Sequence, residues 1–113
     1  NFHGTSTIVN DKVETLAVKN LFNSLSPKIP VSSTKSMVGH PQGASGGLGV
    51  TVSLLSLYNN FLTPTINQEN SDPDCDLDYV PNKGREKKLN IAISNCISFG
   101  SKNSALVLGN FSR

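Results

Sequence analysis

Tryptophan is absent from this chain and cysteine is scarce. The two cysteines, Cys75 and Cys96, do not form a C-x-x-C motif or suggest a disulfide framework, so a reducing compartment is expected. No run of about 18 apolar residues is present and the first residues do not resemble a signal peptide, which argues against a membrane-spanning segment. The formal net charge is only +2, which is too small to suggest nucleic-acid binding.

The length of 113 residues corresponds to one domain or to part of one, because typical domains contain about 100–150 residues. With five phenylalanines and no tryptophan, a core should be mainly aliphatic. A motif that contains His3 stands at the very start of the chain, with no element before it. We therefore expect residues 1–113 to form one domain of a larger protein that has two halves.

Hydrophobic periodicity and the positions of proline predict a layered α/β fold. Asp11 and Glu14 resemble a capping box, and the apolar residues behind them have helical spacing to about Leu25. A second helix is expected over Gly43–Tyr58; it begins with glycines and is then apolar on nearly every face, which is typical of a buried helix. Strands are expected at residues 29–33, 77–80, 89–94 and 104–108, with a polar loop over 65–76 and a turn over 95–103.

The glycine-rich segment Gly43-Ala-Ser-Gly-Gly-Leu-Gly49 could by itself indicate a dinucleotide-binding loop at a helix N-terminus. Such a loop should follow a hydrophobic strand, but Val38-Gly-His-Pro-Gln42 precedes it here. No acidic residue closes a second strand about 20 residues later, because Glu69 lies in a predicted loop. The context therefore argues against nucleotide binding.

Both histidines lie among small and hydroxyl-bearing residues, in Asn1-Phe-His-Gly-Thr-Ser-Thr7 and Ser32-Ser-Thr-Lys-Ser-Met-Val-Gly-His40. Two imidazoles directed at one carbonyl oxygen can stabilise an oxyanion, and a nearby ammonium group, here Lys35, can influence their protonation. A metal site fits less well, because no acidic or thiolate residue lies directly beside either histidine and Lys35 would repel a cation. Each histidine taken alone would more often be an ordinary hydrogen-bonded side chain.

These two segments, with Pro64-Thr-Ile-Asn67 and Asp76-Leu-Asp-Tyr-Val-Pro-Asn82, resemble the C-terminal half of a β-ketoacyl-[acyl-carrier-protein] synthase. The resemblance covers nearly the whole chain and is closest to the elongating type of fatty-acid synthesis. It implies a thiolase-like layered fold, with a mixed β-sheet, a buried glycine-rich helix and covering helices. It also implies an acyltransferase that condenses malonyl-carrier protein with an acyl thioester by a decarboxylative Claisen reaction.

The resemblance implies a role for each matching residue. His3 and His40 would polarise the malonyl thioester carbonyl and stabilise the enolate oxygen that decarboxylation leaves. Lys35 would lie behind the two rings and adjust their charge and geometry. Thr5 and Thr7 match positions whose hydroxyl groups bind the phosphopantetheine arm of the substrate.

Two further positions complete the implied site. Phe99 matches a gate residue whose backbone N–H contributes to the oxyanion hole for acyl transfer. Cys96 is expected to be a buried, unreactive thiol, because the nucleophilic cysteine of the family belongs to the other half of the enzyme. The chain by itself is therefore expected to be inactive. It is also expected to be only marginally stable, because the apolar helix over Gly43–Tyr58 would expose a surface that its missing neighbours cover.

No metal and no resident cofactor are implied, because the phosphopantetheine group arrives on the carrier protein. The implied partners are the acyl carrier protein, the N-terminal half of the synthase and a second copy of the complete enzyme in a homodimer. Neither a nucleic acid nor a membrane is expected as a partner. A bacterial cytoplasm, a plastid or a mitochondrion would each suit this chemistry.

Three positions depart from the family pattern. The family's final loop is Phe-Gly-Phe-Gly-Gly-x-Asn, whereas here Ser98 and Ser101 replace glycines, and serine is strained wherever φ is positive. Gly49 replaces a glutamate that usually pairs with the motif lysine, so Lys35 is expected to be less firmly oriented. These departures predict weaker condensation or altered substrate preference, and Gly49→Glu and Ser98→Gly are expected to raise the rate.

Two other functions stay open at this stage. One is a catalytically degenerate synthase half that only binds the carrier protein or a partner subunit, and an upstream cysteine would distinguish the enzyme from this binding module. The other is a polyketide-synthase condensing domain, whose segments resemble these less closely, particularly over residues 76–82.

Overall fold

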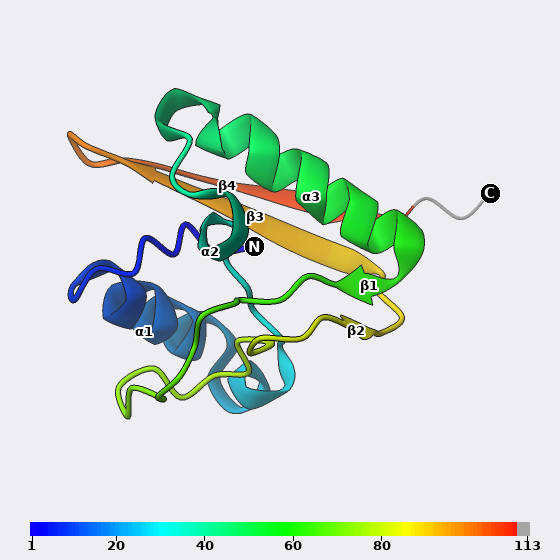
Figure 1. Ribbon diagram of the computed structural model, residues 1–113, viewed down its shortest axis with the longest axis horizontal. Helices are drawn as coiled ribbons and strands as arrows, with labels where there is room; N and C mark the ends of the chain where they lie inside the picture. Colours follow the sequence, from blue (N-terminus) through cyan, green and yellow to red (C-terminus); the bar gives the residue numbers. More distant parts are fainter. Residues whose placement is uncertain (111–113) are drawn as a thin grey trace.

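The computed structural model describes residues 1–110, which form a mixed α/β fold. The helices are α1 (Asn10–Phe22), the 3-10 helix η1 (Asn23–Lys28), α2 (Lys35–Val38), the 3-10 helix η2 (Gln42–Ala44) and α3 (Ser45–Asn59). The strands are β1 (Phe61–Leu62), β2 (Arg85–Glu86), β3 (Ile91–Ser98) and β4 (Lys102–Gly109), in the antiparallel pairs β1–β2 and β3–β4. Helix α3 lies along the β3–β4 hairpin, and α1 lies on the other side of the N-terminal segment (Figure 1).

Helix α3 packs on β3 through small side chains. Its buried residues are Ser45, Gly49, Ser53 and Leu57, one on each turn, so a single narrow stripe faces the sheet. A Cβ atom on Gly49 would lie only 2.8 Å from Ser94 Oγ of β3. The close approach of helix and strand therefore requires a residue without a side chain at this point.

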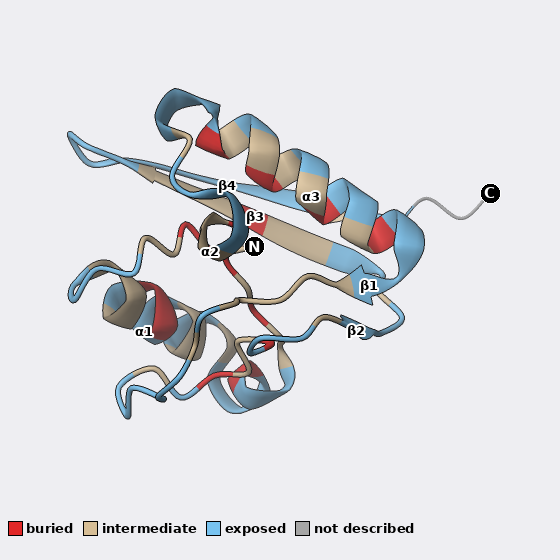
Figure 2. Ribbon diagram, in the orientation of Figure 1, coloured by how far each residue is buried: buried red, intermediate tan, exposed pale blue. Residues whose placement is uncertain are grey.

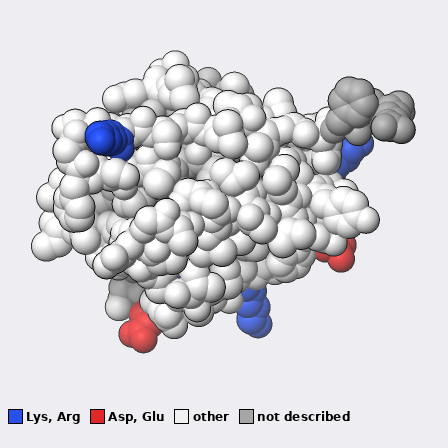
Figure 3. Space-filling model, turned by 90° about the horizontal axis from the view of Figure 1, so that it is seen from above, with Lys and Arg blue, Asp and Glu red and all other residues white. Residues whose placement is uncertain are grey.

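The predicted helix over residues 43–58 is confirmed, but the expectation that it is buried on every face is wrong for this chain. Leu54, Leu55 and Tyr58 of α3 are exposed by 48%, 55% and 83% (Figure 2). The helix contains no charged residue, and the face seen from above in Figure 3 is mostly white, with few charged side chains. The chain itself therefore covers one stripe of α3 and leaves an uncharged apolar face open.

The N-terminal segment is extended and lies between two other parts of the chain. The Asn1 carbonyl accepts a hydrogen bond of 2.9 Å from the Asn95 N–H of β3, and the Phe2 N–H donates to the Ser32 carbonyl at 2.8 Å. Phe2 packs with Val31 and Leu77 in the buried hydrophobic cluster. Because side chains alternate along an extended segment, the next residue, His3, points away from this cluster.

Two predicted strands are irregular segments in the structure. Residues 29–33 and 77–80 are linked by one backbone hydrogen bond, from the Val31 N–H to the Asp78 carbonyl at 2.8 Å. Pro30 cannot donate to a ladder, and Val80 has a φ of +51°, which interrupts the extended conformation. The two-residue strands β1 and β2 were not predicted, because so short a pair has no detectable periodicity.

Other boundaries also differ from prediction. The first helix ends at Phe22 rather than near Leu25, because Asn23 has a φ of +48° and the chain continues as a 3-10 helix. Val9 precedes this helix without a side-chain cap, so the expected capping box of Asp11 and Glu14 does not form. The turn expected over 95–103 shrinks to residues 99–101, because β3 and β4 extend to meet at a tight hairpin. Among residues 1–110, no helix combines the length and apolar character needed to cross a bilayer.

Of the two serines that replace family glycines, only Ser101 is strained. Its φ is +61°, whereas Ser98 pairs with Lys102 inside the β-ladder and is not among the residues with positive φ. We expect Ser101→Gly to stabilise the complete protein that carries this chain by about 0.5–1 kcal/mol, since glycine relieves left-handed strain. Ser98→Gly is the matched control and should destabilise it by a similar amount, because glycine inside a strand loses more conformational entropy on folding. The higher condensation rate expected for this variant is a separate prediction.

Thermal midpoints of the two variants, measured side by side with the parent protein, test this prediction. A lower midpoint for Ser101→Gly than for Ser98→Gly would contradict it.

Candidate active site

The two histidines, distant in sequence, lie side by side in the structure. The centroids of the His3 and His40 rings are 5.5 Å apart, and the ring planes meet at 84°, edge to face. His3 is only 7% exposed, whereas His40 lies at the surface of this chain. The structure therefore brings the two histidine rings together, as the two sequence segments led us to expect.

A short helix and one glycine bring His40 to this position. Helix α2 begins at Lys35 and ends at Val38, and the N–H of the next residue, Gly39, donates to the Lys35 carbonyl at 3.0 Å. Gly39 has a φ of +76°, a conformation that glycine adopts at little cost. The chain therefore turns sharply after α2, and the residue after Gly39 is His40.

The tautomer of His40 follows from a backbone donor. The Gln42 N–H donates to His40 Nδ1 at 3.0 Å, and Ser45 Oγ lies 3.2 Å from the same nitrogen. A backbone N–H can only donate, so Nδ1 of the neutral ring must be unprotonated. The neutral His40 ring therefore carries its proton on Nε2 and presents an N–H donor there.

The same reasoning applies to His3. The Ile97 N–H of β3 donates to His3 Nδ1 at 3.4 Å, and Lys35 Nζ lies 3.4 Å from the same nitrogen. Both neighbours are hydrogen-bond donors, which leaves Nδ1 as the acceptor and Nε2 as the protonated nitrogen. The two neutral rings therefore each have one Nε2–H available for a shared acceptor.

Charge and burial keep His3 in this state. Burial lowers the pKa of His3 below its ordinary value of 6.5, and the Lys35 ammonium lowers it further, while Glu14 opposes the shift. Burial also lowers the pKa of Lys35. His3 is thus favoured as a neutral hydrogen-bond donor at neutral pH.

Lys35 is held without the glutamate that the family pattern places at position 49. Lys35 Nζ donates to the His3 carbonyl at 2.5 Å, so the ammonium group has an anchor here, and the expectation that it is less firmly oriented than with a glutamate stays a prediction. A Cβ atom on Gly49 would lie 2.7 Å from Asn1 Nδ2 and 2.8 Å from Ser94 Oγ. A glutamate at this position would displace both groups, which removes the reason to expect a benefit from Gly49→Glu.

Glu14 is a central residue of the site that sequence analysis placed only in a helix cap. Its side chain is 3% exposed, and its two carboxylate oxygens accept the His3 N–H at 2.9 Å and the Gly4 N–H at 2.7 Å. Gly4 has a φ of +43°, and a Cβ there would lie 2.4 Å from Ser33 Cβ. No local pattern distinguishes such a carboxylate from a helix-capping one, because its partners lie ten and eleven residues earlier.

Thr5, Thr7 and Lys35 line one hollow of about 770 Å³. The hydroxyl oxygens of the two threonines are 3.0 Å apart. Of the predicted site residues, all within residues 1–110, His3, His40 and Phe99 do not line this hollow. The structure therefore forms two neighbouring groups, a threonine-lined hollow and a histidine pair, with Lys35 in contact with both.

Phe99 lies at the tip of the β3–β4 hairpin, and its side chain is fully exposed. It follows Ile97, the donor to His3, by two residues.

Cys96, which was expected to be buried, is half-buried beside α3, where a Cβ on Gly46 would lie 3.7 Å from its sulfur. Residues 1–110 contain no group of three or more His, Cys, Asp or Glu side chains suited to hold a metal ion.

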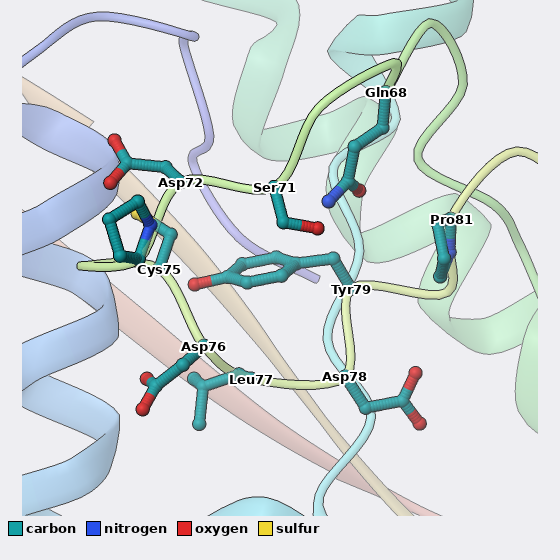
Figure 4. Close-up of a pocket in the computed structure, with 10 residues that line it drawn as sticks. Gln68, Ser71, Asp72, Cys75, Asp76, Leu77, Asp78, Tyr79 and Pro81 are labelled. Atoms are coloured by element: carbon teal, nitrogen blue, oxygen red, sulfur yellow. The ribbon is translucent and has the colours of Figure 1, made fainter.

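The loop over residues 65–81 forms a further wall of the hollow. Tyr79 and Cys75 border both this hollow and a smaller one beside it (Figure 4). The Tyr79 hydroxyl hydrogen-bonds to Thr15 of α1, and burial raises the Tyr79 pKa. Ion pairs from Lys12 to Asp74 at 2.7 Å and from Lys19 to Asp76 at 2.5 Å also tie this loop to α1.

The sequence matches a known family and many curated proteins. The family described as "Beta-ketoacyl synthase, C-terminal domain" matches residues 1–69. The chain is 49% identical over 96% of its length to "3-oxoacyl-[acyl-carrier-protein] synthase 2" of Coxiella burnetii. The proteins of that name from Synechocystis sp. and Staphylococcus aureus are 46% and 45% identical over 94% and 98% of the chain. The chain spans about a quarter of the length of these relatives, 26–27%.

Solved structures show the same architecture. The match to the ishigamide ketosynthase/chain length factor covers 99% of this chain and 27% of the matched chain, with a TM-score of 0.94 and 38% identity. A second solved structure is a type II polyketide acyl-carrier protein in complex with its ketosynthase bound to the hexaketide. The match covers 98% of this chain and 27% of the matched chain, with a TM-score of 0.92 and 35% identity. The layered α/β fold predicted from sequence is therefore confirmed as that of the thiolase-like ketosynthases.

The Glu14 carboxylate should be important for stability. In Glu14→Gln an amide replaces the carboxylate, so one of the two backbone N–H groups it binds loses its acceptor. We expect a loss of about 1–3 kcal/mol in the complete protein, the usual cost of an unsatisfied buried donor. The control is Asp11→Asn, whose partner Ser6 N–H is exposed, and thermal unfolding of both variants provides the measurement.

The lowered pKa of His3 predicts a pH dependence of stability. Because the folded-state pKa lies below 6.5, His3 contributes stability above pH 6.5 that is lost as the pH falls through the folded-state pKa. Lys35→Met should raise the His3 pKa towards its ordinary value, since it removes the positive neighbour. A titration of the His3 ring by NMR in the complete protein measures its pKa in the parent and in Lys35→Met, and unfolding free energies on both sides of pH 6.5 measure the change in stability. An unchanged His3 pKa in Lys35→Met would contradict the assignment.

Proposed function

Because this chain belongs to the family of β-ketoacyl synthase C-terminal domains, we propose that it supplies the oxyanion-stabilising part of a 3-oxoacyl-[acyl-carrier-protein] synthase. The complete enzyme elongates fatty acids by condensing malonyl-carrier protein with an acyl thioester. The observation that carries this proposal is the edge-to-face pair of His3 and His40, each with its Nε2–H unclaimed by the contacts at Nδ1.

The chemistry requires two donors for one oxygen. When the malonyl carboxylate leaves as carbon dioxide, the electron pair of the broken C–C bond passes into an enolate, whose negative charge develops on the thioester oxygen. The Nε2–H groups of His3 and His40 donate to that oxygen. The enolate carbon then attacks the acyl thioester, a new C–C bond forms, and the thiolate of the acylated cysteine leaves. No base has to remove a proton from carbon.

The remaining residues of the site support this step. Lys35 fixes the backbone of His3 and keeps its ring neutral, as its contacts with the His3 carbonyl and Nδ1 indicate. Thr5 and Thr7 bind the phosphopantetheine arm in the hollow that Lys35 also borders. The Phe99 backbone N–H contributes to the oxyanion hole for acyl transfer, and the exposed side chain is free to move as a gate.

The rest of the enzyme supplies the nucleophilic cysteine, which is absent from this chain. We propose that the N-terminal half covers the uncharged face of α3, where Leu54, Leu55 and Tyr58 are exposed, because such patches usually mark interfaces. The acyl carrier protein delivers the substrate, and one solved relative is a carrier protein in complex with its ketosynthase. The complete enzyme works as a homodimer in a reducing compartment, such as a bacterial cytoplasm, a plastid or a mitochondrion, and needs no cofactor beyond the carrier's phosphopantetheine.

A polyketide-synthase condensing domain is the second candidate, because both structural relatives are ketosynthases and one of them is described as a ketosynthase with a type II polyketide carrier protein. Their sequences are 38% and 35% identical to this chain, whereas the 3-oxoacyl-[acyl-carrier-protein] synthases reach 45–49%. The higher identity supports fatty-acid elongation. A catalytically degenerate, carrier-binding half is disfavoured by the intact histidine pair.

The test is the release of carbon dioxide from malonyl-carrier protein by the complete synthase. We expect His3→Ala and His40→Ala each to slow this release by roughly 10²–10³-fold, because each removes one oxyanion donor. The exposed Lys83→Ala is the control and should leave the rate unchanged. Decarboxylation at the parent rate in either histidine variant would refute the proposed role, and a parent enzyme without any decarboxylation would favour the degenerate half.

A further inference from the structure

His40 Nδ1 has two neighbours that can donate to it, and they differ in how firmly they are held. The Gln42 N–H belongs to η2, a 3-10 helix of three residues, and Gln42 is exposed with a φ of +47°. A non-glycine residue with positive φ is strained, and so short a helix is a weak support. The first donor to the ring therefore lies in a poorly supported turn.

The second neighbour, Ser45, is on a rigid element. It is the first residue of α3, which has 15 residues, and it belongs to the buried stripe that packs on β3. Its side chain is 9% exposed, and its Oγ lies 3.2 Å from His40 Nδ1. The helix thus fixes the position of this hydroxyl group relative to the hairpin that contacts His3.

The direction of the Ser45–His40 hydrogen bond follows from the tautomer. The Gln42 N–H already requires an unprotonated Nδ1, and an unprotonated nitrogen offers only a lone pair. In the contact between Ser45 and His40 the hydroxyl group is therefore the donor, and it shares the single Nδ1 lone pair with the Gln42 N–H. A half-turn of the ring about Cβ–Cγ would carry Nδ1 away from both donors.

We propose that Ser45 is a positioning residue for His40: its hydroxyl group donates to Nδ1, holds the ring in one orientation, and so directs the Nε2–H towards the shared oxyanion. This inference rests on the proposed function of the histidine pair. Without Ser45, the ring keeps the Gln42 donor and its tautomer but loses the donor that is anchored to α3.

The kinetic test uses the complete synthase and decarboxylation of malonyl-carrier protein. Ser45→Ala should lower kcat by roughly three- to tenfold, the effect of one ordinary hydrogen bond, without changing KM, because Ser45 does not line the threonine hollow. Ser45→Thr, which retains a hydroxyl group, should restore most of the rate. Ser53→Ala is the matched control, since Ser53 is a buried serine of the same helix that bonds only to the Gly49 carbonyl.

The second readout does not depend on activity. In the complete synthase labelled with ¹⁵N-histidine, the His40 signals are assigned by their loss in His40→Gln. Ser45→Ala should move the unprotonated Nδ1 resonance downfield, as expected when it loses a donor, while Ser53→Ala should not. An unchanged Nδ1 resonance in Ser45→Ala overturns the inference, as does an equal loss of kcat in Ser45→Ala and Ser53→Ala.

The two proposals fail in different ways. If the parent enzyme releases no carbon dioxide, the proposed function is refuted, and the Nδ1 resonance alone still decides whether Ser45 binds His40. If His40→Ala abolishes decarboxylation but Ser45→Ala leaves both kcat and the resonance unchanged, the function stands and the positioning role is refuted.

Discussion

Two charged side chains bind the backbone of His3, one at its N–H and one at its carbonyl, and the site depends on them. The buried Glu14 carboxylate accepts the His3 N–H, and the Lys35 ammonium donates to the His3 carbonyl. Hydrogen bonds with one ionised partner are about twice as strong as neutral ones. Lys35 also begins the short helix that leads to His40, so the contact that fixes one ring also connects it to the segment that carries the other.

Backbone groups determine the tautomers of the two histidine rings. At each Nδ1 a backbone N–H donates, from Ile97 of β3 to His3 and from Gln42 to His40. Backbone donors cannot reverse their role, so the proton of each neutral ring is confined to Nε2. A site built in this way needs little reorganisation when negative charge develops between the rings, which is the main source of oxyanion stabilisation in enzymes.

The three departures from the family pattern differ in their structural consequences. Gly49 lies against Ser94 and Asn1, and Lys35 has an anchor in the His3 carbonyl although no glutamate stands at position 49. Ser98 is part of a regular ladder, whereas Ser101 carries the positive φ of the hairpin turn. Serine in place of glycine therefore has a positive φ at position 101 and none at position 98, and only backbone geometry distinguishes the two.

The sequence alone determined the histidine and lysine segments, the helix over residues 43–58 and the presence of the two C-terminal strands, though not their full length, because these features follow from local spacing and from the resemblance of short segments. It did not reveal Glu14 as a partner of His3, the irregular form of residues 29–33 and 77–80, or the contact of Ser45 with His40. The segments 29–33 and 77–80 are not regular strands, because the hydrogen bonds of a β-ladder require a neighbouring strand in matching register. The role of Glu14 depends on tertiary packing, because a buried carboxylate accepts hydrogen bonds from the donors that the folded chain places beside it.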